Sequence, residues 1–188
     1  ILVTSFLEKG LYGGTQGHFS LLAWKDLWNP SYFRVALSTV LLSCGTTLVT
    51  VALALPAAYA IARSRHKNLL LFLVIVPFWT NFLIRIYAWI AILGNNGYLN
   101  QALLFLGWTD EPVQFLYNGY SVTAVMTYTF LPYAILPLYA SIERFDFSLI
   151  EAAQDLGAGA IQAHLLVLLP NIRAGITASL LFTLIPAL

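Results

Sequence analysis

Long runs of apolar residues between charged ones constrain this chain more than any other feature of its sequence. Crossing the hydrocarbon core of a bilayer, about 30 Å thick, takes roughly 20 mainly apolar residues in a helix. Three runs reach this length: residues 35–62, bounded by Arg34 and Arg63, residues 69–93 and residues 120–142. Of the 188 residues, 60% are hydrophobic and only 9% are charged, unlike an average soluble domain. The sequence therefore predicts an all-α fold, a polytopic transmembrane helical bundle.

Both ends of the sequence are apolar, and neither end segment is long enough to cross a bilayer alone. Residues 1–7 look like the last turns of a helix. Residues 176–188 extend over only about 20 Å as a helix. We therefore expect partial spans at residues 1–7 and 172–188. On this interpretation residues 1–188 are one incomplete transmembrane domain, a fragment with spans missing at both ends.

Charge and cysteine content exclude two classes of function. The formal net charge is +1, and no basic cluster is large enough to neutralise several phosphates of a nucleic acid. The single cysteine, Cys44, lies within the first apolar run. An intrachain disulfide and a cysteine-rich metal site are therefore excluded within this chain.

The sequence also lacks the arrangements of residues that catalysis requires. A phosphate-binding loop needs Gly-Lys followed by Ser or Thr, whereas the lysines here precede Gly10, Asp26 and Asn68. The three histidines are scattered, and the complete apolar runs contain no acidic pair for a proton relay. We expect no catalytic residue, no metal site and no cofactor, and a protein that is not an enzyme by itself.

A basic turn between the first two apolar runs predicts the orientation of the chain. Residues 63–67 carry three Lys or Arg in five positions, and the positive-inside rule places such a turn in the cytoplasm. Alternation then puts residues 8–30 and 94–118 outside and residues 143–170 inside. Residues 94–118 contain no Lys or Arg, which agrees, although three basic residues in or next to segment 8–30 count against the rule.

The two predicted outer loops have local patterns of their own. Residues 10–17 are rich in glycine and predict a flexible loop without the spacing of a phosphate-binding loop. In the other loop, Leu99, Leu103 and Leu106 recur at helical spacing before Gly107, which suits a helix C-terminus. This pattern predicts a short interfacial helix, which either rests on the membrane surface or docks a partner.

The predicted cytoplasmic stretch contains the most informative motif. It reads Glu-Ala-Ala at residues 151–153, then Gly157 after three residues, Val167 after nine more, and Leu-Pro at residues 169–170. We predict two short helices, over about residues 148–156 and 160–168, which the glycine allows to turn sharply. An ordinary amphipathic surface loop is the alternative.

The motif resembles the signature loop of permease subunits of bacterial binding-protein-dependent ABC importers. This resemblance implies an ABC importer permease bundle that crosses the bacterial cytoplasmic (inner) membrane several times. It implies that the loop couples the chain to a separate ATPase subunit, which binds ATP and Mg²⁺ in place of this chain. The residues that it implies for this coupling are Glu151, Ala152, Ala153, Asp155, Leu156, Gly157 and Ala158.

A second resemblance extends over most of the chain. Residues 77–89, 96–100, 131–133 and 136–139 are similar to the first of the two permeases in spermidine/putrescine importers. The resemblance implies polyamine transport with two ATPase copies, a second permease subunit and an external substrate-binding protein. An importer of another solute, such as ferric iron or an anion, is the alternative within the class. A secondary transporter or a channel is the alternative outside it.

One polar stripe within these residues is a candidate for the substrate path. Asn81, Arg85 and Trp89 recur every four positions, on one face of a helix. Because Arg85 would repel a polyamine, we expect it to act in structure or gating, bonded to carbonyl groups or to a carboxylate of a partner chain. Trp79, Tyr87 and Trp89 could hold an ammonium group by cation–π attraction, at about 0.5 to 2 kcal/mol each. Aromatic packing or interfacial anchoring is the alternative for each ring.

Overall fold

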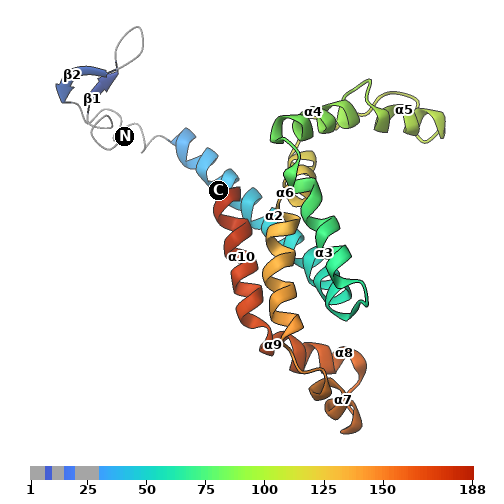
Figure 1. Ribbon diagram of the computed structural model, residues 1–188. Coiled ribbons are helices and arrows are strands. Elements are labelled where there is room, and N and C mark those ends of the chain that lie inside the picture. The colour runs from blue at the N-terminus through green and yellow to red at the C-terminus, as the bar shows by residue number, and fades with distance from the viewer. Residues whose placement is uncertain (1–6, 10–14, 20–29) are drawn as a thin grey trace. The chain divides into compact units, whose positions relative to one another are not determined.

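The computed structural model of the chain describes residues 7–9, 15–19 and 30–188, and most of the described residues lie in helices (Figure 1). The predicted all-α fold class is confirmed. The chain divides into two units, residues 1–42 and residues 43–188. In the first unit, strand β1 (Leu7–Lys9) pairs antiparallel with strand β2 (Thr15–Phe19).

These two short strands correct two expectations. The partial span predicted for residues 1–7 is wrong at Leu7, because Leu7 pairs with Phe19 in an antiparallel ladder. The flexible loop predicted for residues 10–17 is wrong from Thr15 onward for the same reason, since Thr15 pairs with Lys9. The other residues of these two predicted segments, 1–6 and 10–14, lie outside the described residues.

Helix α2 (Pro30–Arg63) has 34 residues, and the second unit begins within this helix, at Ser43. Its buried positions within that unit recur every three or four residues: Ser43, Thr46, Thr47, Thr50, Val51, Ala54, Ala58 and Ile61. This spacing turns one face of the helix toward the protein core. Helix α2 and helix α6 (Gly119–Glu143) are each long and apolar enough to cross a membrane.

The second apolar run, residues 69–93, is not one straight helix. It forms α3 (Lys67–Ile75), the 3₁₀ turn η2 (Val76–Trp79) and α4 (Phe82–Leu93), with a bend of 90° after the turn. Pro77 lies in this turn, and proline lacks the amide hydrogen that a continuing helix needs. Asn81 then begins α4 as its N-cap, accepting a 2.9 Å hydrogen bond from the Leu83 amide. The predicted apolar run is therefore helical on both sides of a sharp bend.

The short helix predicted in the loop after the second apolar run is present as α5 (Tyr98–Phe105), joined to α4 by a short turn. Gly107 follows the C-cap residue Leu106, and its φ of 68° is one that residues with a Cβ rarely adopt. The amides of Gly107 and Trp108 donate to the carbonyls of Leu104 and Leu103, at 3.1 and 3.0 Å. This pair of bonds is the Schellman arrangement that closes a helix C-terminus.

The fully buried side chain of Asn100 holds the segment after α4 together. Its Nδ2 donates to the carbonyls of Gly94 and Val113, at 3.1 and 2.9 Å, and its Oδ1 accepts from the Val113 amide at 2.9 Å. Asn100 has no exposed surface, so an unpaired amide there would be costly. Residues 94–113 are thereby closed into one unit around a single side chain.

Helices α6 and α10 (Arg173–Ala187) run side by side in the second unit (Figure 1). Helix α10 buries small residues every four positions: Gly175, Ser179, Thr183 and Ala187. A Cβ on Gly175 would lie 2.6 Å from the Cβ of Ser141 and 3.0 Å from the carbonyl oxygen of Pro137. The helices therefore approach closely through small residues, as helices in membranes do.

Four short elements lie between α6 and α10, at one end of this pair (Figure 1). They are α7 (Ser148–Asp155), α8 (Ala160–Ala163), the π-helical turn η3 (His164–Leu168) and α9 (Leu169–Asn171). Ile150, Ala163 and Leu168 belong to the same buried cluster as residues of α2 and α6. The short elements are thus packed on the bundle and are not a detached loop.

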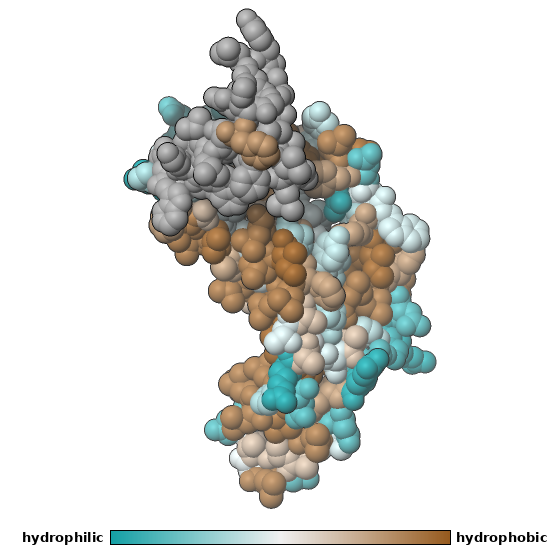
Figure 2. Space-filling view, turned by 90° about the vertical axis from the view of Figure 1, so that its left-hand side faces the viewer, coloured by the Kyte–Doolittle hydropathy of each residue, from teal (hydrophilic) through white to brown (hydrophobic). Residues whose placement is uncertain are grey.

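The surface of the second unit is largely apolar. Large exposed side chains include Phe72 and Leu73 on α3 and Leu181 and Phe182 on α10. In Figure 2, broad hydrophobic areas cover much of the visible described surface. Such a surface is disfavoured in water and suits a protein whose solvent is lipid.

Candidate functional site: a helical hairpin on the bundle and a cavity around Arg85

The motif found in the sequence forms a compact turn between α7 and α8. Helix α7, this turn and helix α8 together form the hairpin. Helix α7 begins at Ser148, as predicted, and the amide of Ser148 donates to Asp146 Oδ1 at 3.0 Å. The side-chain hydrogen bond with Ser148, and then this backbone bond, hold the pKa of the Asp146 carboxyl below its ordinary value. The start of α7 is therefore fixed by a carboxylate outside the helix.

Gly157 ends α7 in a conformation that other residues adopt with strain. Its φ is 92°. The amides of Gly157 and Ala158 donate to the carbonyls of Gln154 and Ala153, at 2.9 and 3.0 Å, which is again a Schellman arrangement. No atom of the described residues lies within 4 Å of the place where a Cβ of Gly157 would be. Glycine is favoured here because of its backbone conformation, and not because a side chain would lack space.

The second predicted helix, residues 160–168, is helical but irregular. After one turn of α8, residues 164–168 adopt π-helical hydrogen bonding, in which the Leu169 amide donates to the His164 carbonyl. Pro170 contributes to this irregularity, because it has no amide hydrogen to offer the preceding turn. Segments 160–171 and 173–187 meet at a bend of 71°.

The residues of the motif lie on the surface of this hairpin. Glu151, Ala152, Asp155, Leu156 and Gly157 are exposed, and Ala153 and Ala158 are half-buried. Leu156, at the end of α7, is 90% exposed, and Ile161 in α8 is 77% exposed. Apolar side chains are thus displayed beside carboxylates at the tip of the hairpin. Burying one such side chain fully is worth about 1.5 to 3 kcal/mol.

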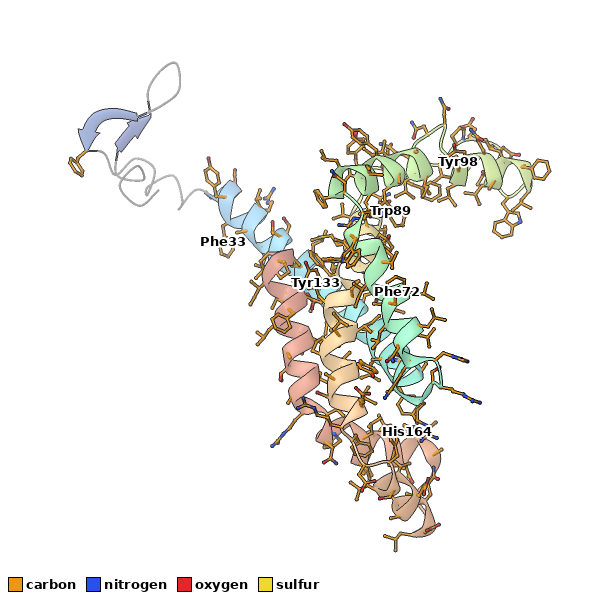
Figure 3. The ribbon with its side chains drawn as sticks, viewed as in Figure 1. Phe33, Phe72, Trp89, Tyr98, Tyr133 and His164 are labelled. Atoms are coloured by element: carbon orange, nitrogen blue, oxygen red, sulfur yellow. The ribbon has the colours of Figure 1, made fainter. Side chains whose placement is uncertain are left out.

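Aromatic residues attach the hairpin to the end of α2. Phe147, which precedes α7, packs edge to face on Tyr59, with ring centroids 6.0 Å apart. The guanidinium of Arg63 lies 4.9 Å from the centroid of the Phe147 ring. His164 contacts Tyr59 from the other side of the hairpin, and Figure 3 shows its position beside the short helices.

An ion pair joins the basic turn to the end of α6. Lys67 Nζ lies 2.6 Å from Glu143 Oε1. The two residues are 76 positions apart, and both side chains are partly exposed. The basic turn, the end of α6 and the hairpin therefore lie at the same end of the second unit. Helices α4 and α5 lie at the other end (Figure 1).

Arg85 is placed among aromatic rings. Its guanidinium lies 5.5 Å from the centroid of Phe78 and 6.0 Å from that of Phe82. Within the described part of the chain, its Nε is buried without a hydrogen-bond partner. Arg85 therefore rests on the faces of rings, and the expected hydrogen bond to a carbonyl group is not made by Nε.

Two cavities meet at Arg85. One, of about 230 Å³, is lined by Phe78, Tyr128 and Pro132 among other residues, and the second, of about 250 Å³, by Trp89 and Tyr128. Trp89 packs edge to face on Tyr128, with centroids 5.7 Å apart. Arg85 lines both cavities, which are otherwise mainly apolar and aromatic.

The four residues predicted for a substrate path are not gathered in one place. Trp89 lines a cavity, but Trp79 at the end of η2 is 82% exposed and Tyr87 is 68% exposed. Tyr87 is two residues from Trp89 and points to the opposite side of α4. The side-chain oxygen of Asn81 is used to cap α4. Of the predicted stripe, Arg85 and Trp89 share a cavity.

Sequence reasoning missed residues from α6 and α2. Tyr128 and Pro132, four positions apart on α6, line the cavity together with Arg85. Their spacing was visible, but nothing in the sequence says which helix faces α4. Tyr59 and His164 were missed because a contact between distant residues leaves no local pattern. Among the described residues, no group of three His, Cys, Asp or Glu is placed to hold a metal ion.

Known proteins match this chain along its length, although no protein-family model does. The spermidine/putrescine transport system permease protein PotB of Escherichia coli (strain K12) is 40% identical over 190 residues, which cover 100% of this chain and 69% of that protein. The protein of the same description from Haemophilus influenzae is 36% identical, covering 100% of this chain and 66% of its own length. The inner membrane ABC transporter permease protein YdcU of Escherichia coli is 31% identical over 173 residues, covering 85% and 55%.

Together with the apolar helical fold, these relatives define the class of protein: it is a permease subunit of an ABC transporter. Such a chain is a transport subunit and not an enzyme, as predicted. Within this class, the chain belongs to the family of the spermidine/putrescine transport system permease protein PotB. The resemblance identified from residues 77–89, 96–100, 131–133 and 136–139 is thereby confirmed.

Proposed function

We propose that this chain forms part of the membrane pathway of an ATP-driven polyamine importer. In this assembly, an external binding protein delivers spermidine or putrescine, and a second permease subunit completes the pathway. Two copies of a separate ATPase subunit supply the energy. The chain lies in the bacterial cytoplasmic membrane and crosses it several times. The likeness to spermidine/putrescine permeases over the whole chain carries this proposal.

The hairpin of α7 and α8 is the proposed contact with the ATPase subunit. Its tip displays Leu156 and Ile161 beside Glu151 and Asp155. A lipid surface would be a poor partner for these carboxylates, whereas a protein groove can accept both kinds of side chain. The backbone of the tip is fixed by the Gly157 turn, so a force applied there is transmitted to the bundle. Ala152, Ala153 and Ala158 allow a partner to approach closely.

The proposed orientation places the hairpin in the cytoplasm, where ATP is available. The ion pair between Lys67 and Glu143 supports this orientation, because it keeps the basic turn at the same end as the hairpin. Residues 94–118, which contain no Lys or Arg, then lie outside. α5 is proposed to rest at the outer membrane surface.

For the substrate, we propose that this chain contributes aromatic faces and few charges. Within the described ranges, the residues that line the two cavities at Arg85 include no carboxylate. A buried polyamine without carboxylates would be strongly disfavoured. Trp89 with Tyr128 offers ring faces for an ammonium group, and Trp79, Asn81 and Tyr87 remain weaker candidates. Arg85 is assigned to structure or gating, with a carboxylate of a partner chain as its proposed counter-charge.

Uptake by the full complex tests this proposal. The chain, within its full-length subunit, is reconstituted in liposomes with the ATPase, the second permease and the binding protein. We expect ATP-dependent uptake of labelled spermidine and putrescine, and none of ferric iron or of an anionic solute. Trp89→Ala should raise KM for the polyamine, by the amount expected for a lost cation–π contact of about 0.5 to 2 kcal/mol.

Trp108→Ala is the matched control, because Trp108 is exposed on the loop after α5. It should leave uptake unchanged. Absence of polyamine uptake in the wild-type complex would contradict the substrate assignment. Equal uptake by Trp89→Ala and the wild type would contradict the proposed ring contact alone.

A further inference from the structure

A hydrogen bond joins the second half of the hairpin to helix α2. The Tyr59 hydroxyl and Nε2 of His164 are 3.1 Å apart, and the residues are separated by 105 positions. The rings also meet edge to face, with centroids 5.3 Å apart. Both side chains are half-buried, where a hydrogen bond is stronger than in water.

The histidine ring is held in place by the backbone of α8. Its Nδ1 lies 2.7 Å from the carbonyl oxygen of Ala160, the first residue of α8. A carbonyl oxygen only accepts, so Nδ1 carries the hydrogen. In the neutral ring Nε2 is then an acceptor, and the Tyr59 hydroxyl donates to it. The ring is therefore a rigid bridge from the first turn of α8 to α2.

Both halves of the hairpin converge on the last two turns of α2. Phe147, at the entrance of α7, contacts Tyr59 and lies under Arg63, while His164, after α8, contacts Tyr59 directly. Tyr59 and Arg63 are four residues apart, on the same face of the helix. Both halves of the hairpin therefore contact the same short stretch of α2.

We propose that the Tyr59–His164 pair is the contact through which displacement of the hairpin reaches helix α2. The proposal rests on the proposed coupling function of the hairpin. The backbone route to α10 passes through the π-helical turn and the 71° bend, two irregular features that can absorb movement. The side-chain bridge leaves the chain at His164, the first residue of the π-helical turn, and so bypasses the rest of that turn and the bend. Tyr59 and His164 are positioning residues, which act through the helices that carry them.

The test is the number of solute molecules transported per ATP hydrolysed in the reconstituted complex. Tyr59→Phe removes the hydroxyl and keeps the ring, and His164→Ala removes the acceptor. Each should lower this ratio by about threefold to tenfold, in the range of coupling energies between residues in contact. The double variant should be no worse than the poorer single variant, because the bond is already absent. The rate of ATP hydrolysis should stay within about twofold of the wild type.

Controls separate this role from a general loss of stability. Tyr98→Phe and His66→Ala are matched substitutions at rings whose polar atoms make no hydrogen bond in the described part of the chain, and both should keep the wild-type ratio. His164→Gln keeps a polar group near the position of Nε2 and should recover part of the ratio. The proposal is wrong if the double variant lowers the ratio by the product of the two single effects. It is also wrong if Tyr59→Phe keeps the wild-type ratio.

The ratio is measured with whichever solute the wild-type complex takes up: spermidine, putrescine, ferric iron or an anion. A wrong polyamine assignment therefore leaves the test of the pair intact. If the ATPase subunit does not bind the wild-type permease, the coupling function and the pair proposal fail together. If it binds and the ratio responds as expected, both are supported whatever the solute.

Discussion

At Gly157 the cost of any other residue is conformational. The φ of 92° and the free space around the Cβ position mean that a side chain fits but strains the backbone. The left-handed region costs about 1 to 2 kcal/mol for residues with a Cβ. Gly157→Asp should therefore lower coupled uptake by about five- to thirtyfold, while the subunit still inserts and assembles. Uptake per assembled complex is the measurement.

Gly159→Asp is the control for this change, because it adds the same charge two residues away. Gly159 has a φ of −65° and is the N-cap of α8, a position that suits Asp. Its added Cβ would have an ordinary contact with Gln162, at 3.8 Å. If both substitutions reduce uptake equally, the added charge and not the turn geometry is responsible.

For single residues, the sequence predicted the structure only where the local backbone conformation determines the residue type. The spacing of the motif identified Gly157 and the start of α7 at Ser148, because glycine at a sharp turn has a local cause. It could not identify Tyr59 as the partner of His164. That contact depends on how α2 packs against the hairpin, and no local pattern of residues encodes it.

Among the elements, the close contact between α6 and α10 is sensitive to side-chain size. Gly175→Ala places a Cβ against Ser141 and the carbonyl of Pro137. We expect a loss of about 1 to 3 kcal/mol in stability, as for other overpacked sites. The purified complex in detergent should show a lower midpoint of thermal unfolding.

Gly45→Ala is the matched control for this prediction, since no atom from the described segments lies within 4 Å of its Cβ position on α2. It should leave the unfolding midpoint unchanged or raise it, because alanine is the better helix former. Ser141→Gly should restore part of the stability lost in Gly175→Ala. Equal midpoints for the two alanine variants would contradict the close approach.

Hydropathy predicted where helical segments occur but not where they bend. Residues 69–93 are mainly apolar on both sides of Pro77, so the hydropathy pattern does not show the break there. Proline within a membrane helix is often tolerated, and Pro56 lies inside the unbroken helix α2. The bend at residues 80–81 depends in addition on Asn81 capping α4, which a hydropathy pattern does not report.

For the whole molecule, the testable consequence is the side of the membrane on which each end of the bundle lies. Single cysteines at Arg65 and Asp110, in a Cys44→Ser background, should label differently in intact cells. An impermeant maleimide should reach position 110 and not position 65. Arg65 is preferred to Lys67 because Lys67 holds Glu143.

Permeabilised cells provide the control, since both cysteines should then label. Labelling of position 65 alone in intact cells would invert the proposed orientation, and labelling of both would contradict a transmembrane arrangement between them. Either result would also move the hairpin away from the compartment that holds ATP.

The buried side chain of Asn100 has a consequence for association. Its three hydrogen bonds close residues 94–113 before any partner arrives. A protein that contacts this segment meets a surface whose conformational entropy has already been lost on folding. Preorganised surfaces of this kind bind with a smaller entropic penalty than loops that order on contact. A partner can therefore bind at this end of the molecule through a smaller contact area than a flexible loop would need.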